Sequence, residues 1–288
     1  RFSLLRSRTK GTQALQGALD WSWDLLKPWA KAALSQTAVF RSGFDVSAAE
    51  KILDCGNLKE APPIFDILQD LSENSLLQQR KDSEGHIRYD LLESIRQYSR
   101  AKLKDEDALE EGLSGAKANR ETELRHAEYF SGFGRKEFLD SLDNQGSLQN
   151  WEAFFDDLDN FVAGTDYGSG KMASLCCLAA MKILGMKGPI SLGVNVVEET
   201  LKKTDLSSRQ TKQLEVLRTR FLRISGRMNE ARGERRQRGR GTLDKSEEEI
   251  IVSEVEKRKD DEIISNSESG SAKTTETEEA NVEQYSEN

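Results

Sequence analysis

The stretch Ser75-Leu-Leu-Gln-Gln-Arg-Lys-Asp-Ser-Glu-Gly-His-Ile-Arg-Tyr-Asp90 decides the fold of this chain. Its ends, 75–79 and 86–89, read as two strands around a polar connection in which Gly85 is the turn residue. The pattern therefore predicts a β-hairpin with its loop over residues 80–85. Asp90 leads into apolar residues at helical spacing up to about Leu103, which predicts a helix directly after the hairpin.

Several helices are predicted before the hairpin. Apolar residues recur at spacings of three and four from Thr12 to Leu26, a pattern typical of an amphipathic helix. Proline in an opening turn and Ser as a capping residue mark the next helices, over 28–40, from 47, and from 62–63 to about 73. Three helices, a hairpin and a closing helix predict a winged-helix domain over residues 12–104.

A second helical region follows a charged, glycine-containing stretch at 105–117, which we expect to be a linker. Helical patterns then recur in series. They cover 118–142, 151–162, 172–184, 190–204 and 207–225, with a further helix starting near residue 228. Helices of similar length in series predict TPR-like helical hairpins over residues 118–240. The fold class expected is therefore mainly α, with one β-hairpin.

The charge of the chain is concentrated at its C-terminal end. The whole chain has a formal net charge of −8, and residues 244–288 alone carry 15 acidic and 5 basic residues. The rest of the chain is close to neutral. A segment this acidic, with few aromatic residues, cannot bury enough apolar surface to fold. We therefore expect residues 241–288 to form a disordered acidic tail.

Cysteine usage and hydropathy indicate the compartment. Three cysteines provide no disulfide framework, and so few suit a reducing environment. No apolar run reaches the length of a membrane span. We therefore expect a cytoplasmic protein with no membrane partner. The chain begins with Arg1, which suggests a piece of a longer protein.

Six segments of the sequence resemble one known family. Arg88-Tyr-Asp-Leu-Leu-Glu-Ser-Ile-Arg-Gln-Tyr98 is the most similar of them, and the order and spacing of all six agree with the family. The others are 12–26, 38–50, 68–77, 125–130 and 157–160. They resemble the winged helix and the first TPR-like repeats of bacterial STAND-type, NB-ARC-like ATPases of the kind associated with LuxR and SARP regulators.

The resemblance implies that the domains of a longer protein have separate functions. In such proteins an upstream P-loop domain binds ATP or ADP, the winged helix acts as a lid on the nucleotide, and the repeats sense an inducer or a protein partner. Residues 1–11 would then be the end of the upstream ATPase module. The resemblance thus implies that this chain holds the lid and the sensor arm, with no cofactor of its own.

Tyr89 and Asp90 are the candidate nucleotide-sensing residues. They match the position of the Met-His-Asp motif of NB-ARC proteins, with Tyr89 in place of the histidine. A phenol can donate a hydrogen bond to a phosphate but cannot supply the charge of an imidazolium. The alternative is that Tyr89 packs inside the wing and Asp90 caps the next helix.

No catalytic or metal site is predicted. Gly168-Ser-Gly-Lys171 lacks the first glycine, the hydroxyl residue and the preceding strand of a P-loop. His86 and His126 are isolated from each other and from the cysteines. We therefore expect this chain not to be an enzyme, although the longer protein implied by the resemblance could hydrolyse ATP.

Two regions are candidates for binding nucleic acid. The helix expected over 62–73, in the place of a recognition helix, contains no Lys or Arg, whereas phosphate binding needs cations. The hairpin offers Arg80, Lys81 and Arg88, partly offset by acidic neighbours. The strongest basic patch belongs to residues 218–240. It ends in Arg232, Arg235, Arg236, Arg238 and Arg240, which bind a polyanion or else form a solvated helix face neutralised by the acidic tail.

The sequence favours a regulatory function. The expected role is that of a lid and sensor arm acting through interdomain and protein–protein contacts, with the apolar side of residues 12–26 as a docking surface for the upstream domain. The alternative is a nucleic-acid-binding transcriptional regulator that uses the winged helix or the Arg-rich segment 218–240.

Overall fold

The computed structural model describes residues 2–55, 58–81, 85–110, 112–143 and 148–227, with side chains from residue 14 on except at 148–150. Within these residues the chain is mainly helical and contains one antiparallel hairpin, which confirms the expected fold class. The expected acidic tail, the helix near residue 228 and the arginines from Arg232 to Arg240 lie outside the described residues.

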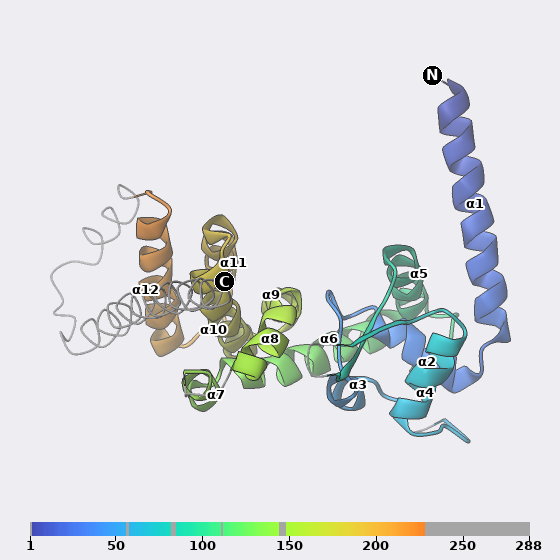
Figure 1. The fold of residues 1–288 in the computed structure, drawn as a ribbon, viewed down its shortest axis with the longest axis horizontal. Coiled ribbons are helices and arrows are strands. Elements are labelled where there is room, and N and C mark those ends of the chain that lie inside the picture. The colour runs from blue at the N-terminus through green and yellow to red at the C-terminus, as the bar shows by residue number, and fades with distance from the viewer. Residues whose placement is uncertain (1, 56–57, 82–84, 111, 144–147, 228–288) are drawn as a thin grey trace, which may run out of the picture. The chain divides into compact units, whose positions relative to one another are not determined.

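The winged-helix domain is built from five helices and the hairpin (Figure 1). Pro28 opens α2, and the Asp45 side chain caps α3 by accepting a hydrogen bond from the Ala48 amide at 2.7 Å. The elements are α1 (Phe2–Leu25), α2 (Pro28–Thr37), α3 (Val46–Ile52), α4 (Ile64–Glu73), β1 (Gln78–Lys81), β2 (Ile87–Asp90) and α5 (Glu93–Lys104).

The first strand begins later than the sequence predicts, at Gln78 instead of Ser75. The amides of Leu76 and Leu77 both donate to the Leu71 carbonyl, at 2.9 and 3.2 Å, and so close the end of α4. Ser75 adopts a left-handed backbone with φ of 60° in this closing turn. The backbone of residues 75–77 therefore closes the C-terminal end of α4 and does not pair with β2.

The wing is tied to the helical core of its own domain through residue 89. Gln79 lies opposite Tyr89 in the hairpin, and Tyr89 also exchanges two backbone hydrogen bonds with Phe44, at 2.7 and 2.8 Å. The ring of Phe44 stacks on that of Phe40, with centroids 4.1 Å apart. These three aromatic residues are almost completely buried and fix the wing against α2.

The second region is a series of helices packed on their neighbours in sequence. α9 packs on α10, α10 on α11, and α11 on α12. The elements are α6 (Gly115–Ser131), the 3-10 helix η1 (Gly132–Gly134), α7 (Lys136–Ser141), α8 (Leu148–Asp156), α9 (Leu158–Tyr167), α10 (Gly170–Lys187), α11 (Ile190–Leu201) and α12 (Ser208–Ile224). We call α6–α12 the helical array.

Two helices expected to be continuous are broken. The one expected over 118–142 is interrupted at Gly132–Gly134, where the chain passes the backbone of α10 at Leu175. The one expected over 151–162 is divided at Asp157 into α8 and α9. In both cases the local sequence favours a continuous helix, but contacts with residues distant in the sequence break it.

α6 joins the two regions. It packs on α3 and α5 of the winged-helix domain and on α9 and α10 of the array (Figure 1). His126 of α6 is fully buried, with the rings of Phe40, Phe130 and Tyr167 around it. Burial lowers the pKa of His126 to about 3, so the ring is neutral and acts as one more aromatic residue of a shared core. Within the described residues no helix is long and apolar enough to cross a membrane.

Candidate regulatory interface between the wing and the helical array

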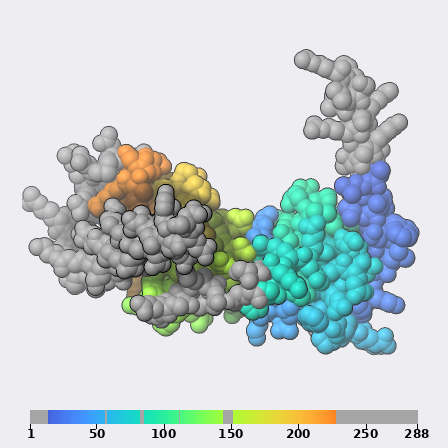
Figure 2. All heavy atoms as spheres, in the orientation of Figure 1, coloured from blue at the N-terminus to red at the C-terminus, as the bar shows by residue number. Residues whose placement is uncertain are grey.

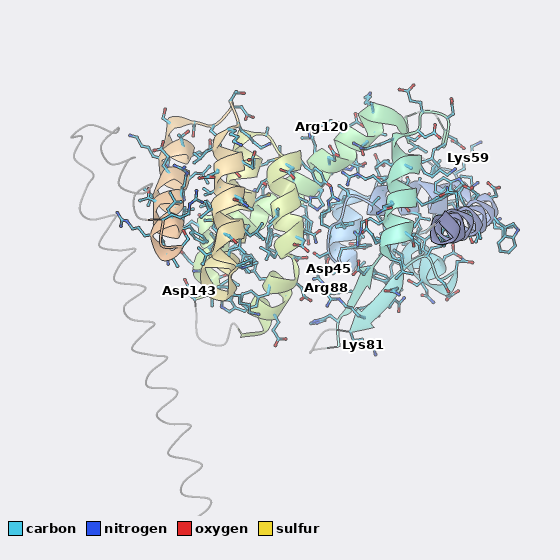
Figure 3. The ribbon with its side chains drawn as sticks, turned by 90° about the horizontal axis from the view of Figure 1, so that it is seen from above. Asp45, Lys59, Lys81, Arg88, Arg120 and Asp143 are labelled. Atoms are coloured by element: carbon cyan, nitrogen blue, oxygen red, sulfur yellow. The ribbon has the colours of Figure 1, made fainter. Side chains whose placement is uncertain are left out.

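Arg88 of β2 leaves the wing and enters the junction with the helical array. Its Nη2 donates to Oδ1 of Asp157 at 2.6 Å and to the Gly43 carbonyl at 2.7 Å. Only 6% of its side chain is exposed. Figure 3 shows Arg88 at the side of the hairpin that faces the array, near Asp45, whereas Lys81 lies at the hairpin end. A buried guanidinium of this kind requires the carboxylate partner that Asp157 provides.

The carboxylates come from the break between α8 and α9. Asp156 accepts from Nη2 of Arg80 at 2.9 Å across a partly exposed contact, and Asp157 takes the buried arginine. Burial raises the pKa of Asp157 to about 6, and the charge and hydrogen bond of Arg88 oppose this rise. The division of the expected helix at Asp157 therefore places two adjacent carboxylates against the wing.

Asn160 of α9 contacts the backbone beneath the wing. Its Oδ1 accepts from the amides of Arg41 and Ser42, at 2.9 and 3.4 Å. Its Nδ2 donates to the Gly43 carbonyl at 3.2 Å and to Asp157 at 3.1 Å. One buried amide thus satisfies the polar backbone that follows α2 and also orients the carboxylate that holds Arg88.

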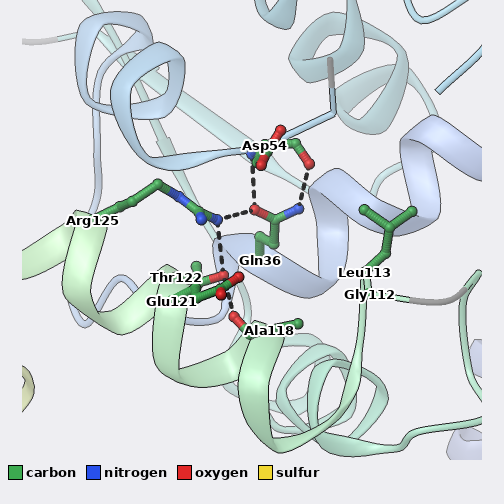
Figure 4. Close-up of a pocket in the computed structure, with 8 residues that line it drawn as sticks. All are labelled: Gln36, Asp54, Gly112, Leu113, Ala118, Glu121, Thr122 and Arg125. Atoms are coloured by element: carbon green, nitrogen blue, oxygen red, sulfur yellow. Dashed lines mark hydrogen bonds between the residues drawn. The ribbon is translucent and has the colours of Figure 1, made fainter. Parts of the chain in front are cut away.

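Arg125 makes a second polar junction, at the C-terminal end of α3. Its Nε donates to the Ile52 carbonyl at 2.7 Å, and its Nη2 donates to Oε1 of Gln36 at 2.9 Å (Figure 4). Gln36 in turn exchanges two hydrogen bonds with the backbone of Asp54. The cavity beside these residues measures about 20 Å³, which is room for about one water molecule. This junction therefore joins α6 to the ends of α2 and α3.

We call Arg80, Arg88, Asp156, Asp157 and Asn160 the wing clamp. Through it, the array neutralises two of the three cations that the wing offers. The sequence indicates Arg80 and Arg88 only as wing cations and 157–160 only as a segment resembling the start of the repeats. Their pairing across 69–76 residues leaves no periodic signal in the sequence.

The outward side of α4 carries no cation. Asp66 and Glu73 are exposed there, Asp70 is half-buried, and Phe65 is 44% exposed. α4 contains no Lys or Arg, as the sequence indicated. Because DNA phosphates are bound by cations, this side of α4 does not provide a phosphate-binding surface.

Tyr89 and Asp90, the candidate nucleotide-sensing pair, lie in different environments. Tyr89 is 1% exposed and stacks near Phe44, and burial raises the pKa of its hydroxyl. Asp90 accepts from Arg96 at 2.9 Å and from the Leu91 amide at 2.8 Å. The N-cap of α5 is Leu92, so Asp90 stabilises the turn before the helix and does not cap it. Contact of either residue with a nucleotide stays a prediction.

The described residues of the basic segment are partly paired, since Arg218 donates to Glu198 at 2.8 Å. The cysteines Cys55, Cys176 and Cys177 are buried free thiols. In the part of the chain that the structure describes, no three His, Cys, Asp or Glu side chains gather where they could hold a metal ion.

Comparisons with known proteins find similarity over part of the chain. Residues 26–104 match the family model of the winged helix-turn-helix domain. A stretch of 108 residues, 36% of this chain, is 32% identical to "Putative HTH-type transcriptional regulator Rv0890c" of Mycobacterium tuberculosis strain H37Rv. The same identity and coverage hold for the protein of that type named Mb0914c in Mycobacterium bovis.

The match spans 12% of the length of each of these relatives. No solved structure matches the chain. The winged-helix domain expected from the sequence is thus confirmed, and the chain is similar to proteins named as transcriptional regulators. These findings favour the transcription-regulator alternative over the lid of a STAND-type ATPase.

Proposed function

We propose that this chain is part of a DNA-binding transcriptional regulator in which the helical array controls the wing. The observation that carries the proposal is the wing clamp, in which Arg80 and Arg88 are held by Asp156 and Asp157. The winged helix-turn-helix match over residues 26–104 supports the DNA-binding part. The clamp supports the regulatory part, because the wing cations are already engaged by carboxylates.

The electrostatics indicate which element would contact DNA. α4 carries no cation, so we assign the phosphate contacts to the wing and not to α4. While the clamp is closed, Arg88 is buried and the two carboxylates add negative charge beside Arg80. Opening the clamp would expose Arg88, release the already half-exposed Arg80 and move the carboxylates away. A signal received by the array could therefore be transmitted as a change in DNA affinity.

Releasing the clamp is expected to increase DNA affinity. The double variant Asp156→Asn, Asp157→Asn keeps the shape of both side chains and removes their charges. Each phosphate contact adds about 0.9 to the slope of log K against log salt, so two freed arginines should steepen the slope by about 1.8. We expect about tenfold tighter binding at low salt. Fluorescence anisotropy of labelled duplex DNA with the full chain measures both quantities.

Two controls separate this effect from a change in net charge. Glu128→Gln with Glu137→Gln removes the same charge from exposed sites of the array and should leave the slope unchanged. Adding Arg80→Gln to the clamp variant should remove about half of the gain. Because Asp157 is buried, Asp156→Asn alone is also tested; it should free Arg80 without disturbing the core. Equal slopes for the wild type and both clamp variants would contradict the proposal.

The second candidate function is the lid and sensor arm of a STAND-type signalling ATPase. The six segments resembling that family, and the position of Tyr89 and Asp90 at the end of the wing, support it. In this role the chain would act through contacts with an upstream nucleotide-binding domain and with an inducer or protein on the array.

Nucleotide retention tests this second candidate in a longer protein that includes an upstream nucleotide-binding domain. Tyr89→Phe keeps the buried ring and removes only the hydroxyl. If the hydroxyl donates to the ADP phosphate, the variant should release labelled ADP several-fold faster. Identical release rates would remove Tyr89 from the candidate nucleotide site.

A further inference from the structure

The helical array contains a pocket over one side of α10. η1 packs on α7 and on α10, and α12 packs on α10 and on α11, beside which it lies in Figure 2 (α12 orange, α11 yellow). Between α7 and α12 the surface of α10 forms a hollow with a volume of about 450 Å³. This volume is typical of small-molecule sites. We call this hollow, which is lined by Lys136, Leu139, Lys171, Leu175, Leu178 and Arg209, the α10 pocket.

Contacts within the array fix the walls of the α10 pocket. The backbone of η1 at Gly134 lies directly against the carbonyl of Leu175, where an added Cβ would collide with it. On the opposite side, Nε2 of Gln210 donates to the Ser174 hydroxyl at 2.9 Å and so ties α12 to α10. Oε1 of Gln210 accepts from the Ser207 amide at 2.8 Å, which orients this side chain. The shape of the pocket is therefore set by the packing of the protein, as is usual for small-molecule sites.

The floor of the α10 pocket is apolar. Leu139 of α7 and Leu175 and Leu178 of α10 line it, and each is partly exposed. Leu175 and Leu178 are three residues apart and therefore lie on one side of the helix. They belong neither to the hydrophobic core nor to the side chains packed on it. Their apolar surface is thus available to the apolar part of a ligand.

The rim of the pocket is cationic. Lys136, Lys171 and Arg209 contribute one exposed cation from each of α7, α10 and α12. Among the described lining residues Asp140 is the one acid, and its carboxylate lies 3.9 Å from Nζ of Lys136. Lys171 and Arg209 form no salt bridge with any described residue. These two cations are therefore available to pair with an anionic group at the edge of the apolar floor.

We propose that the α10 pocket binds a small organic anion, whose apolar body lies on the leucines and whose anionic group faces Lys171 and Arg209. Inorganic phosphate is disfavoured, because it would leave the apolar floor exposed to water. A neutral apolar molecule is disfavoured, because it would not use the cations of the rim. Binding of the anion does not depend on the opening of the wing clamp or on contact with DNA.

Titration of the full chain with a fluorescent organic anion tests this proposal. The probe is anilinonaphthalene sulfonate, which combines an aromatic body with one sulfonate and becomes fluorescent on apolar surfaces. Lys171→Gln with Arg209→Gln should weaken its binding about tenfold. Lys59→Gln with Arg223→Gln removes the same charges from exposed sites that do not line the pocket, and should leave the affinity unchanged. Leu178→Ser should weaken the probe several-fold without lowering the melting temperature, since Leu178 is not packed on the core.

Competition at constant ionic strength identifies the chemistry of the occupant. Octanoate should displace the probe, whereas octylamine, which has the same chain length and the opposite charge, should not. Inorganic phosphate at the same concentration should also leave the probe bound. Equal displacement by octanoate and octylamine, or displacement by phosphate as effective as that by octanoate, would overturn the proposal. So would failure of the probe to bind, or an affinity that the Lys171→Gln, Arg209→Gln and Leu178→Ser changes leave as in the wild type, because the probe would then occupy another surface.

Discussion

Gly134→Ala is expected to lower the free energy of unfolding by about 3 kcal/mol or more. An added Cβ at residue 134 would lie 1.8 Å from the carbonyl oxygen of Leu175. That oxygen belongs to the backbone of α10, which cannot rotate away as a flexible side chain could. The variant must therefore separate η1 from α10, and with it part of the shared core. Urea denaturation followed by circular dichroism measures the loss.

The neighbouring glycine provides a matched control. Gly132 lies in the same short 3-10 helix, and an added Cβ there meets nothing within 4 Å. Its backbone is right-handed helical, with φ of −56°, so alanine adopts it without strain. Gly132→Ala should be neutral, or more stable by about 0.5 kcal/mol through the lower entropy of the unfolded chain. Similar losses for both variants would contradict the close approach of η1 to α10.

Arg88→Met is expected to cost about 3 kcal/mol at pH 8. The substitution leaves Asp157 buried without the cation that compensates its charge. Burial already raises the pKa of Asp157 to about 6, and loss of Arg88 raises it further. The folded variant then holds a proton that the unfolded chain releases above its ordinary pKa. Its stability should therefore fall as the pH rises, and the loss relative to the wild type should be smaller at pH 5 than at pH 8.

Removing the unpaired charge of Asp157 should restore part of this stability. In the double variant Arg88→Met, Asp157→Asn, an amide replaces the buried carboxylate and keeps the hydrogen bond that Asn160 can donate. We expect the pH dependence specific to Arg88→Met to disappear and the double variant to be more stable than Arg88→Met at pH 8. Thermal melting at both pH values provides the comparison. A loss for Arg88→Met that does not change with pH would show that Asp157 is not the group left unpaired.

Local patterns predicted the elements of the fold well where local interactions determine them. Pro28 and Gly85 of the hairpin loop mark boundaries through backbone geometry, which acts within a few residues. The cap of α3 was predicted at Ser47, whereas the structure places it at Asp45. Among the predictions that were wrong, that of the first strand was overturned by a local turn and that of the helix over 118–142 by a distant contact. The first strand was shortened by the closing turn after Leu71, and the helix over 118–142 was broken where Gly132–Gly134 passes α10.

The sequence identified several residues of the candidate site but not which of them contact one another. The sequence provided Arg80, Arg88 and the segment 157–160, but no periodicity relates a strand to a helix junction far along the chain. The acidic side of α4 was read correctly, because charge is a property of composition. The apolar side of residues 12–26 was expected to be a docking surface, but the sequence did not distinguish the exposed Trp21 from the buried Trp23.

The sequence by itself determined the order of elements, the winged-helix domain and the absence of cations from α4, because helical periodicity, turn residues and charge are local properties. Only the tertiary structure decided that the wing arginines are held by Asp156 and Asp157, and that Trp23 is buried while Trp21 is open. Both outcomes depend on which distant surface packs against a residue. The neighbour that packs against a buried charge or an exposed ring sets its contribution to the free energy of folding, and the local sequence does not.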